Sequence, residues 1–472
     1  MTTLVWFRHD LRIHDNPALF NAAEMGEGVV AVYVHCAAWV SRHNTAPAQL
    51  DFVRRHLHIL KQDLAALNIP LKIIHVQKAA EIAPALLGIA QSSQAGHLFF
   101  NAEYPIDEIN RDLAVSNLLK TQGILVKRFH DRCLVPPGMI RNGQGNPYKV
   151  FTAFKKKWLQ TVMPTRISPH GAPAKQPASD ARSVGKEEID KLFSQHDLKD
   201  LSAHWPAGEA EAYRRLDAFI ENFIAHYEER RDIPSVDGTS GLSPYFAVGS
   251  LSSRQALAAV LSFTHGEWDG NSGAQCWINE LIWREFYYHV VVDFPHVCKH
   301  QPMQTYTDAF PWSYNTAIFK AWCEGKTGIP IVDAAMRQLN STGWMHNRLR
   351  MVVAMFLSKN CQIDWRLGER YFMSQLIDGD FAANNGGWQW SASTGADAAP
   401  YFRIFNPISQ GERFDPNGEF VRKWVPELAH LPNKKIHNPP ALENYPAPVV
   451  NLAESRKSTI TLFAQLSSST TT

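Results

Sequence analysis

The stretch Leu376–Pro407 concentrates side chains that can hold a large, partly polar ligand. It contains aspartates, two adjacent asparagines, a glycine pair, two tryptophans and an Arg-Ile-Phe-Asn-Pro sequence. Asparagine beside Gly-Gly favours turns, so we expect any helix here to break around Asn384–Gly387 and free backbone and amide groups for the ligand. Trp388 and Trp390 add broad, flat rings. This composition predicts one wall of a cofactor site.

A second group of polar and aromatic side chains recurs at helical spacing. Glu280, Trp283, Arg284 and Tyr287 fall on one face of a helix. Such a face is ordinarily a solvent-exposed row of ion pairs. Two large aromatic rings on the same face are unfavourable there, because they would expose apolar surface to water. A cleft lined by stacking rings, with an acid that contacts a base or a flavin, explains the pattern better.

A third group lies further along the chain. Trp344, Asn347 and Arg350 step by three residues along one side of a helix. An arginine can hold a carboxylate through two hydrogen bonds, and Asp378 and Asp380 are the candidate partners. A purely structural buried pair explains the same residues equally well.

Hydroxyl groups and glycine recur at a turn that leads into a helix. The residues Thr239–Ser243 can present hydroxyl and N–H groups to a phosphate. A capped helix start, with Ser243 followed by Pro244, is the alternative, and both interpretations can hold together. Basic residues with phosphate-binding potential recur near these segments: Arg231, Arg284, Arg348 and Arg403.

Composition excludes several other classes of protein. We find no catalytic triad of Ser, His and Asp, no P-loop and no G-x-G-x-x-G sequence. No paired histidines occur at metal-ligand spacing, so no metal site is expected. The six cysteines are widely spaced, and the chain lacks a leader or a long apolar run, which favours the cytoplasm and no membrane. A net charge of +2 requires any DNA partner to meet a local basic patch.

The hydrophobic pattern divides the chain in two. Residues 1–130 alternate strand-like and helical runs, which predicts a doubly wound parallel α/β sheet, and residues 206–455 predict an all-α domain. Residues 131–205 read as a linker and 456–472 as a frayed tail. The strand-like runs are Leu4–Phe7, Val29–His35, Leu71–Val76 and His97–Phe100, and the helical runs between them are Ala48–Leu67 and Glu108–Thr121.

Two arginines follow the first predicted strand. Arg8 and Arg12 can bind an anion or fix an interface between domains, and we favour the interface.

Several long motifs, in the same order, resemble the DNA photolyase/cryptochrome family. The similarity extends over nearly the whole chain and is greatest to bacterial class I cyclobutane pyrimidine dimer photolyases with a folate antenna. The motifs are Arg8–Arg12, Thr239–Pro244, Trp277–Phe286, Thr342–Arg350 and Asp378–Asn406.

The resemblance implies two cofactors. It implies an antenna, 5,10-methenyltetrahydrofolate, near His43, Glu108, Cys298 and Lys299. It implies FAD in the helical domain, with Asn384 beside the flavin nitrogen N5. The family's FAD-binding positions fall here on Tyr227, Thr239, Ser240, Gly241, Leu242, Ser243, Trp277, Glu280, Arg284, Asn347, Arg350, Asp378, Gly379, Asp380 and Asn384.

The resemblance also implies electron transfer and DNA binding. Trp388, Trp365 and Trp312 correspond to the family's tryptophan relay, which reduces oxidised flavin in light. The lesion would be flipped out of UV-damaged DNA into a pocket where Glu280 stabilises it. The DNA-contacting positions are Arg231, Glu280, Trp283, Arg284, Tyr287, Asn347, Arg348, Leu349, Arg350, Met351, Trp390, Arg403 and Gln410.

The implied activity is light-driven splitting of cyclobutane pyrimidine dimers by an electron from reduced FAD, in a monomeric protein. Two alternatives within the family remain. A cryptochrome would signal rather than repair, and it often carries a long regulatory tail. A (6-4) photolyase usually has paired histidines where this chain has Met345-His346-Asn347.

Overall fold

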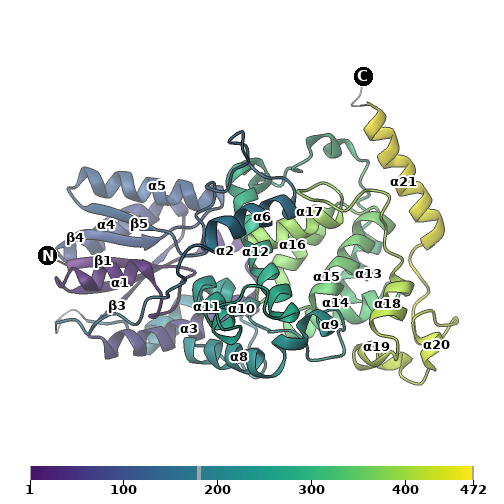
Figure 1. Cartoon of the computed structure of the whole chain (residues 1–472), viewed down its shortest axis with the longest axis horizontal. Coiled ribbons are helices and arrows are strands. Elements are labelled where there is room, and N and C mark those ends of the chain that lie inside the picture. The colour runs from purple at the N-terminus through teal and green to yellow at the C-terminus, as the bar shows by residue number, and fades with distance from the viewer. Residues whose placement is uncertain (1, 178–181, 470–472) are drawn as a thin grey trace.

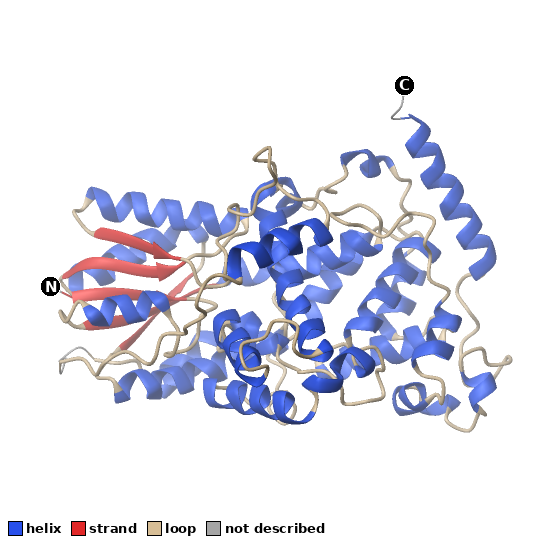
Figure 2. Cartoon of the chain, viewed as in Figure 1, coloured by secondary structure: helices blue, strands red, loops and turns tan. Residues whose placement is uncertain are grey.

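The computed structural model describes residues 2–177 and 182–469. A five-stranded parallel sheet with its helices occupies one end of the molecule, and an assembly of helices forms the rest (Figures 1 and 2). The strand order is β3-β2-β1-β4-β5. The strands are β1 Thr2–Phe7, β2 Val29–Cys36, β3 Leu71–Val76, β4 Ala95–Asn101 and β5 Leu125–Phe129.

Alternate residues of β1 face opposite sides of the sheet, as the period of two in a strand requires. Val5 and Phe7 pack into the core beneath α1 and α3. Leu4 and Trp6 pack into a second core beneath α4 and α5. Helices therefore cover both faces, which confirms the predicted doubly wound sheet. The helices of this domain are α1 Pro17–Glu24, α2 Ala37–Arg42, α3 Pro47–Ala66, α4 Ile82–Ser92 and α5 Ile106–Thr121.

The sequence reading missed the edge strand β5. Its residues are mostly exposed, and Lys127 and Arg128 interrupt the apolar run. Charged residues on an edge strand discourage pairing with other chains, but they also weaken the sequence signal for a strand.

The segment between the domains is more ordered than the predicted surface linker. It contains α6 (Phe151–Val162) and α7 (Lys186–Phe193), and residues 178–181 of the expected linker lie outside the described residues. Trp158 and Phe193 are fully buried in the core. The expected linker, residues 131–205, is therefore partly folded, because its sparse apolar residues pack into the hydrophobic core.

The second domain is helical, as predicted, and its longest helix, α12, carries many of the candidate site residues. Its helices are α8 Glu209–Asn222, α9 Tyr227–Arg230, α10 Ser243–Val248, α11 Ser253–Phe263, α12 Ser272–Asp293, α13 Thr316–Glu324, α14 Pro330–Thr342, α15 Asn347–Met355, α16 Trp365–Gln375, α17 Phe381–Ser391, α18 Pro407–Phe414, α19 Glu419–Trp424 and α20 Asn433–Ile436.

The last helix, α21 (Leu452–Ser469), replaces most of the expected frayed tail. Figure 1 shows it at the end of the molecule far from the sheet. Phe463 is buried and lies 4.5 Å from the ring of Phe310. Thr459 donates a hydrogen bond to the carbonyl of Lys359 at 2.6 Å. These contacts stabilise a Ser/Thr-rich segment as a helix, which helix propensity alone does not predict. Residues 470–472 lie outside the described part of the chain.

Buried ion pairs join the two domains. Arg12 donates to the carbonyl of Gly249 at 2.9 Å and to Asp131 at 2.6 Å. Arg254, from α11, contacts Asp131 at 2.6 Å and Asp15 at 3.0 Å. The interface interpretation of Arg12 is confirmed by these contacts. Arg8 stays within the sheet domain and pairs with Asp112 at 2.8 Å.

Candidate cofactor and DNA-binding site

The helical domain encloses a cavity of about 510 Å³, here called the central cavity. It draws residues from α9, α10, α12, α15 and α17, so segments distant in sequence meet around one space. The predicted site residues that line it are Tyr227, Arg231, Thr239, Ser240, Gly241, Leu242, Ser243, Trp277, Glu280, Trp283, Arg284, Tyr287, Asn347, Arg348, Arg350, Met351, Asp378, Asp380, Asn384, Trp388 and Trp390.

Helix α17 forms one wall of the central cavity and runs without a break from Phe381 to Ser391. The expected break at Asn384–Gly387 was wrong. Asp380 caps the helix by accepting a hydrogen bond from the N–H of Ala383 at 3.1 Å, which starts the helix firmly. A Cβ at Gly386 would lie 2.1 Å from the ring of Tyr287, so this glycine allows α12 to approach closely rather than ending α17.

Asn384 lines the central cavity from the first turns of α17. Its amide nitrogen donates to the carbonyl of Glu369 at 3.0 Å. The neighbouring Asn385 donates to the carboxylate of the same Glu369 at 2.7 Å. The hydrogen bond to Glu369 therefore fixes the orientation of the Asn384 carboxamide, and the bond from Asn385 ties the Glu369 side chain to the same helix.

Arg350 and Asp378 form an ion pair of 2.7 Å at the edge of the central cavity. Arg350 also donates to the carbonyl of Met345 at 2.8 Å. Asp378 was one of the two partners that sequence suggested for Arg350. Among the described residues, Asp378 Oδ1 is buried and has no hydrogen-bond partner. A buried acceptor left over beside a cavity fits a polar ligand that supplies a donor.

Glu280 and Arg231 form a second ion pair, 2.6 Å long, that links α12 to the end of α9. Arg231 also contacts the thiol of Cys276 at 3.1 Å. Burial raises the pKa of Glu280, and the nearby Arg231 opposes that rise. The carboxyl group is thus closer to protonation than an exposed glutamate and is able to serve as a donor or an acceptor.

Aromatic rings line the cavity beside this acid. Trp283 stacks face to face on Phe151 with ring centroids 3.7 Å apart and an angle of 6° between the planes. Tyr287 lies against Trp283 at 5.7 Å. Phe151 belongs to α6 in the expected linker, and sequence reasoning gave it no role. Its stacking fixes the orientation of the Trp283 ring.

Of the three tryptophans of the expected relay, Trp388 is the one that lines the central cavity. Trp388 is buried and lines the cavity, and a Cβ at Gly368 of α16 would lie 2.1 Å from its ring. Trp365 is the first residue of α16 and is fully buried. Ser313, next to Trp312, forms a parallel bridge with Ile363. Main-chain pairing therefore brings the segment of Trp312 beside the start of α16.

The residues assigned to DNA contact separate into three groups. Arg348 lines the central cavity and pairs with Asp232 at 2.6 Å. Arg403 and Gln410 lie outside both cavities described here. Leu349 is 1% exposed and packs in the hydrophobic core, so its assignment to DNA contact was wrong. It lies between two residues that line the cavity, but a helix turns its side chain toward the opposite side.

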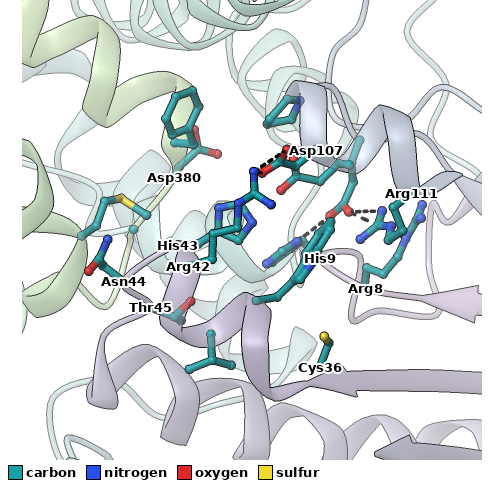
Figure 3. Close-up of a pocket in the computed structure, with 18 of the residues that line it drawn as sticks. Arg8, His9, Cys36, Arg42, His43, Asn44, Thr45, Asp107, Arg111 and Asp380 are labelled. Carbon is teal, nitrogen blue, oxygen red and sulfur yellow. Dashed lines mark hydrogen bonds and ion pairs between the residues drawn. The ribbon is translucent and has the colours of Figure 1, made fainter. Parts of the chain in front are cut away.

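A larger cavity of about 750 Å³ lies between the domains and is here called the interdomain cavity (Figure 3). The four residues expected around an antenna all line it: His43, Glu108, Cys298 and Lys299. Gly379, expected among the FAD-binding residues, lines this cavity and not the central one, and its carbonyl accepts from Gln49 at 2.8 Å. Asp380 lines both cavities.

The interdomain cavity has a charged rim. Arg42 contacts Asp107 at 2.8 Å, a pair drawn in Figure 3. Burial raises the pKa of Glu108 to about 7 and lowers the pKa of His43. Glu108 Oε2 and His43 Nε2 are buried without hydrogen-bond partners among the described residues. These two orphaned polar atoms fit a ligand that offers complementary donors and acceptors.

Sequence reasoning missed several residues that support these sites. Glu369 orients Asn384, and Tyr288 donates to Asp380. Arg132 donates to the main-chain carbonyls of α10, Phe246 at 3.1 Å and Ala247 at 3.0 Å. Glu369 and Tyr288 lie inside helices and Arg132 lies in a loop, so only the fold reveals their partners.

Across residues 2–177 and 182–469, no helix is both long enough and apolar enough to cross a membrane. The same residues contain no group of three or more His, Cys, Asp or Glu side chains placed to hold a metal ion. The six cysteines are free.

Comparison with known proteins assigns the family. Residues 3–178 match the sequence profile described as DNA photolyase, and residues 277–465 match the profile described as the FAD binding domain of DNA photolyase. Proteins named deoxyribodipyrimidine photo-lyase are 46% identical in Vibrio cholerae and 45% identical in Escherichia coli, each over 98% of both chains. A crystal structure of a bacterial class III photolyase from Agrobacterium tumefaciens has a TM-score of 0.86 and 33% identity, covering 99% of this chain and 98% of that one. The chain belongs to the DNA photolyase family and has its FAD-binding domain.

Proposed function

We propose a division of labour among the residues of the two cavities in the light-driven splitting of cyclobutane pyrimidine dimers in DNA, the reaction of this photolyase. One observation carries the proposal. The central cavity brings together a half-buried Arg–Asp pair, a paired acid, stacked aromatic rings and the innermost of three tryptophans. Reduced FAD, when bound there, supplies the electron that breaks the two carbon–carbon bonds of the dimer.

The chain's own residues hold and tune the cofactor. Arg350 and Asp378 supply a charged pair with one spare acceptor at the cavity wall. The hydroxyl-bearing turn Thr239–Ser243 faces the same space and offers donors to phosphate oxygens. Asn384, held by Glu369, presents a neutral amide to the flavin. A neutral group there favours the anionic reduced form of the cofactor.

The aromatic side of the central cavity receives the lesion. Trp283 and Trp390 offer ring faces for the flipped dimer, and Glu280 and Asn347 offer polar atoms to its base edges. Photolyases are themselves a standard example of base flipping, and extruding the damaged bases costs a few kcal/mol. Arg348 and Arg403 are assigned to contact DNA phosphates, and such contacts give affinity without sequence preference.

The tryptophan series serves a different step, which is the reduction of oxidised flavin. An electron passes inward from Trp312 through Trp365 to Trp388, whose ring borders the cavity. The burial of Trp365 and Trp388 keeps water away from the two inner rings.

The interdomain cavity holds the antenna, 5,10-methenyltetrahydrofolate. Its support is the pair of orphaned polar atoms on Glu108 and His43, which a flat, hydrogen-bonding ring system can satisfy. The protein acts as a monomer, and its six free cysteines suit the reducing cytoplasm.

The lesion pocket is tested by DNA binding in the dark. Wild type, Trp283→Ala and Arg348→Ala are each titrated with an oligonucleotide that contains one thymine dimer. The same oligonucleotide without the dimer is the control. Trp283→Ala should lose most of the preference for the damaged strand, because one stacking face is worth about 1–3 kcal/mol. Arg348→Ala should weaken both complexes equally, because phosphate contacts do not distinguish them. Full preference retained in Trp283→Ala would refute the assigned pocket.

A further inference from the structure

Tyr314 places its hydroxyl against a buried carboxylate at the outer end of the tryptophan series. The ring is 65% exposed, whereas Asp364 is 4% exposed. The Tyr314 hydroxyl donates to Asp364 Oδ2 at 2.9 Å. The phenol therefore lies in solvent while its proton is held by the protein.

Main-chain pairing fixes this arrangement. The N–H of Ser313 donates to the carbonyl of Gln362 at 2.7 Å, and the N–H of Asp364 donates to the carbonyl of Ser313 at 3.3 Å. In extended backbone, residues two apart project from the same side with Cα atoms roughly 6.5 Å apart, so Tyr314 flanks Trp312. Asp364 directly precedes Trp365, so the pair links the chain segments that carry the two outer tryptophans.

The surroundings of Asp364 fix the position of its carboxylate. It accepts the N–H of Arg366 at 3.0 Å as the cap of α16, and the Arg366 guanidinium lies 3.4 Å away. The hydrogen bond to Asp364 raises the pKa of Tyr314, so the phenol is protonated at neutral pH. A phenol at 2.9 Å from a carboxylate has its proton acceptor within direct hydrogen-bond reach.

We propose that Tyr314 reduces oxidised Trp312 and so ends the electron relay at the protein surface. One electron moves from the phenol to the indole radical cation, and the phenolic proton moves to Asp364 Oδ2. Trp312 becomes neutral, Tyr314 becomes a neutral radical and Asp364 gains the proton, so charge and atoms balance. The inference rests on the proposed relay, in which photoexcited oxidised flavin is the oxidant.

The step has a physical consequence for the relay. Once the proton has moved, the electron cannot return from Trp312 to Tyr314 without the proton returning too. Oxidation is then held at an exposed ring that external thiols can reach. Another tyrosine, Tyr401, lies beyond two phenylalanine rings: Phe463 is 5.8 Å from it, and Phe310 lies 4.3 Å from Trp312. Tyr314, by contrast, lies two residues from Trp312 in the chain and donates its hydroxyl to a carboxylate.

The test is flash photolysis of the full-length, FAD-loaded protein in its oxidised state. Transient absorption and electron paramagnetic resonance follow the tryptophan and tyrosyl radicals. In wild type, the tryptophan signal should decay into a tyrosyl signal, and more slowly in heavy water because a proton moves. Tyr314→Phe should abolish the tyrosyl signal and prolong the tryptophan signal. Asp364→Asn should slow the step by about tenfold or more, the scale of losing a positioned base.

Tyr306→Phe is the matched control, since Tyr306 is 36% exposed in the nearby η4 turn (Thr305–Ala309). It should behave as wild type. A tyrosyl signal that survives in Tyr314→Phe, or disappears in Tyr306→Phe, overturns the proposal. A tryptophan signal that never becomes tyrosyl in wild type overturns this step alone. Absence of any tryptophan signal overturns the relay itself, and this step with it.

Discussion

Arg350 of α15 and Asp378, which precedes α17, are joined by an ion pair of 2.7 Å beside the central cavity. The carboxylate side chain is only 2% exposed, and one of its oxygens keeps no partner among the described residues. Helix α15 and the segment before α17 therefore meet at an ion pair whose spare carboxylate oxygen can accept a hydrogen bond from a bound flavin nucleotide.

Asp378→Asn should weaken FAD binding. Arg350 then keeps its charge without a counter-charge. Breaking a fully buried pair costs about 3–5 kcal/mol, and this one costs less because Arg350 is 26% exposed. If even a third of the fully buried cost falls on the FAD complex, affinity drops by about tenfold. The flavin-to-protein ratio after purification, read by absorbance, measures the loss.

Glu427→Gln provides the control for this variant. Arg337 and Glu427 also form a pair of 2.7 Å, but away from both cavities. This variant should retain a full complement of flavin. Equal flavin loss in the two variants would mean that Asp378 acts on folding alone.

Glu280→Ala should lower repair per absorbed photon more than it lowers affinity for damaged DNA. The carboxyl group is assigned to stabilise the charged dimer, and one such hydrogen bond is worth about 1 kcal/mol, or roughly fivefold. Dimer loss is measured at a counted photon dose, and affinity is measured in the dark. Glu280→Gln, which keeps a donor, should recover part of the yield. A yield unchanged in Glu280→Ala would remove the role assigned here.

Trp312→Phe should slow photoreduction of oxidised flavin while sparing repair by protein reduced chemically beforehand. The ring belongs to the proposed relay and does not line the central cavity, so dimer splitting should not need it. Flavin absorbance under continuous blue light, with an external reductant, gives the rate. Strong loss of repair in the pre-reduced variant would count against a separate relay.

Glu108→Gln should lower the folate content without changing the FAD content. Burial raises the pKa of Glu108 to about 7, and its Oε2 atom has no partner among the described residues, so the group is free to bind the antenna. Heating releases both chromophores, and their spectra give the stoichiometry. An unchanged folate-to-FAD ratio would remove Glu108 from the antenna site.

Acid should destabilise the fold through His56. Burial lowers its pKa to about 3, and Nδ1 donates to the carbonyl of Phe52 while Nε2 accepts from the N–H of Gly208 at 3.1 Å. The unfolded chain binds a proton below about pH 6.5 and the folded one does not. Stability present above that pH is therefore lost on acidification, at about 1.4 kcal/mol per pH unit.

Thermal midpoints of wild type and His56→Gln, measured between pH 7.5 and 5.5, test this assignment. The difference in thermal midpoint between wild type and His56→Gln should become smaller as the pH falls. His14 provides a contrast, because its hydrogen bond to Glu209 raises its pKa. The stability that His14 adds is present below pH 6.5 and is lost as the pH rises through its folded pKa. The difference in thermal midpoint between wild type and His14→Gln should therefore increase in acid. A difference that stays constant with pH for His56→Gln would rule out the linkage.

The sequence was sufficient for features that depend on local pattern. The alternating strand and helix runs predicted the parallel sheet, and helical spacing brought Glu280, Trp283 and Tyr287 to one cavity. Tertiary packing decided the rest. Helix α17 survives its Gly-Gly pair because Gly386 accommodates Tyr287, and Leu349 turns inward from a helix whose neighbours line the cavity.

The measurement that bears most directly on the function is the loss of thymine dimers from an oligonucleotide incubated with the FAD-loaded, reduced protein under blue light. Restored thymines should accumulate in the light and remain at background in darkness. An oligonucleotide with a (6-4) lesion should stay unrepaired under the same light. Dimers that persist under illumination, or that disappear equally fast in the dark, would contradict the account.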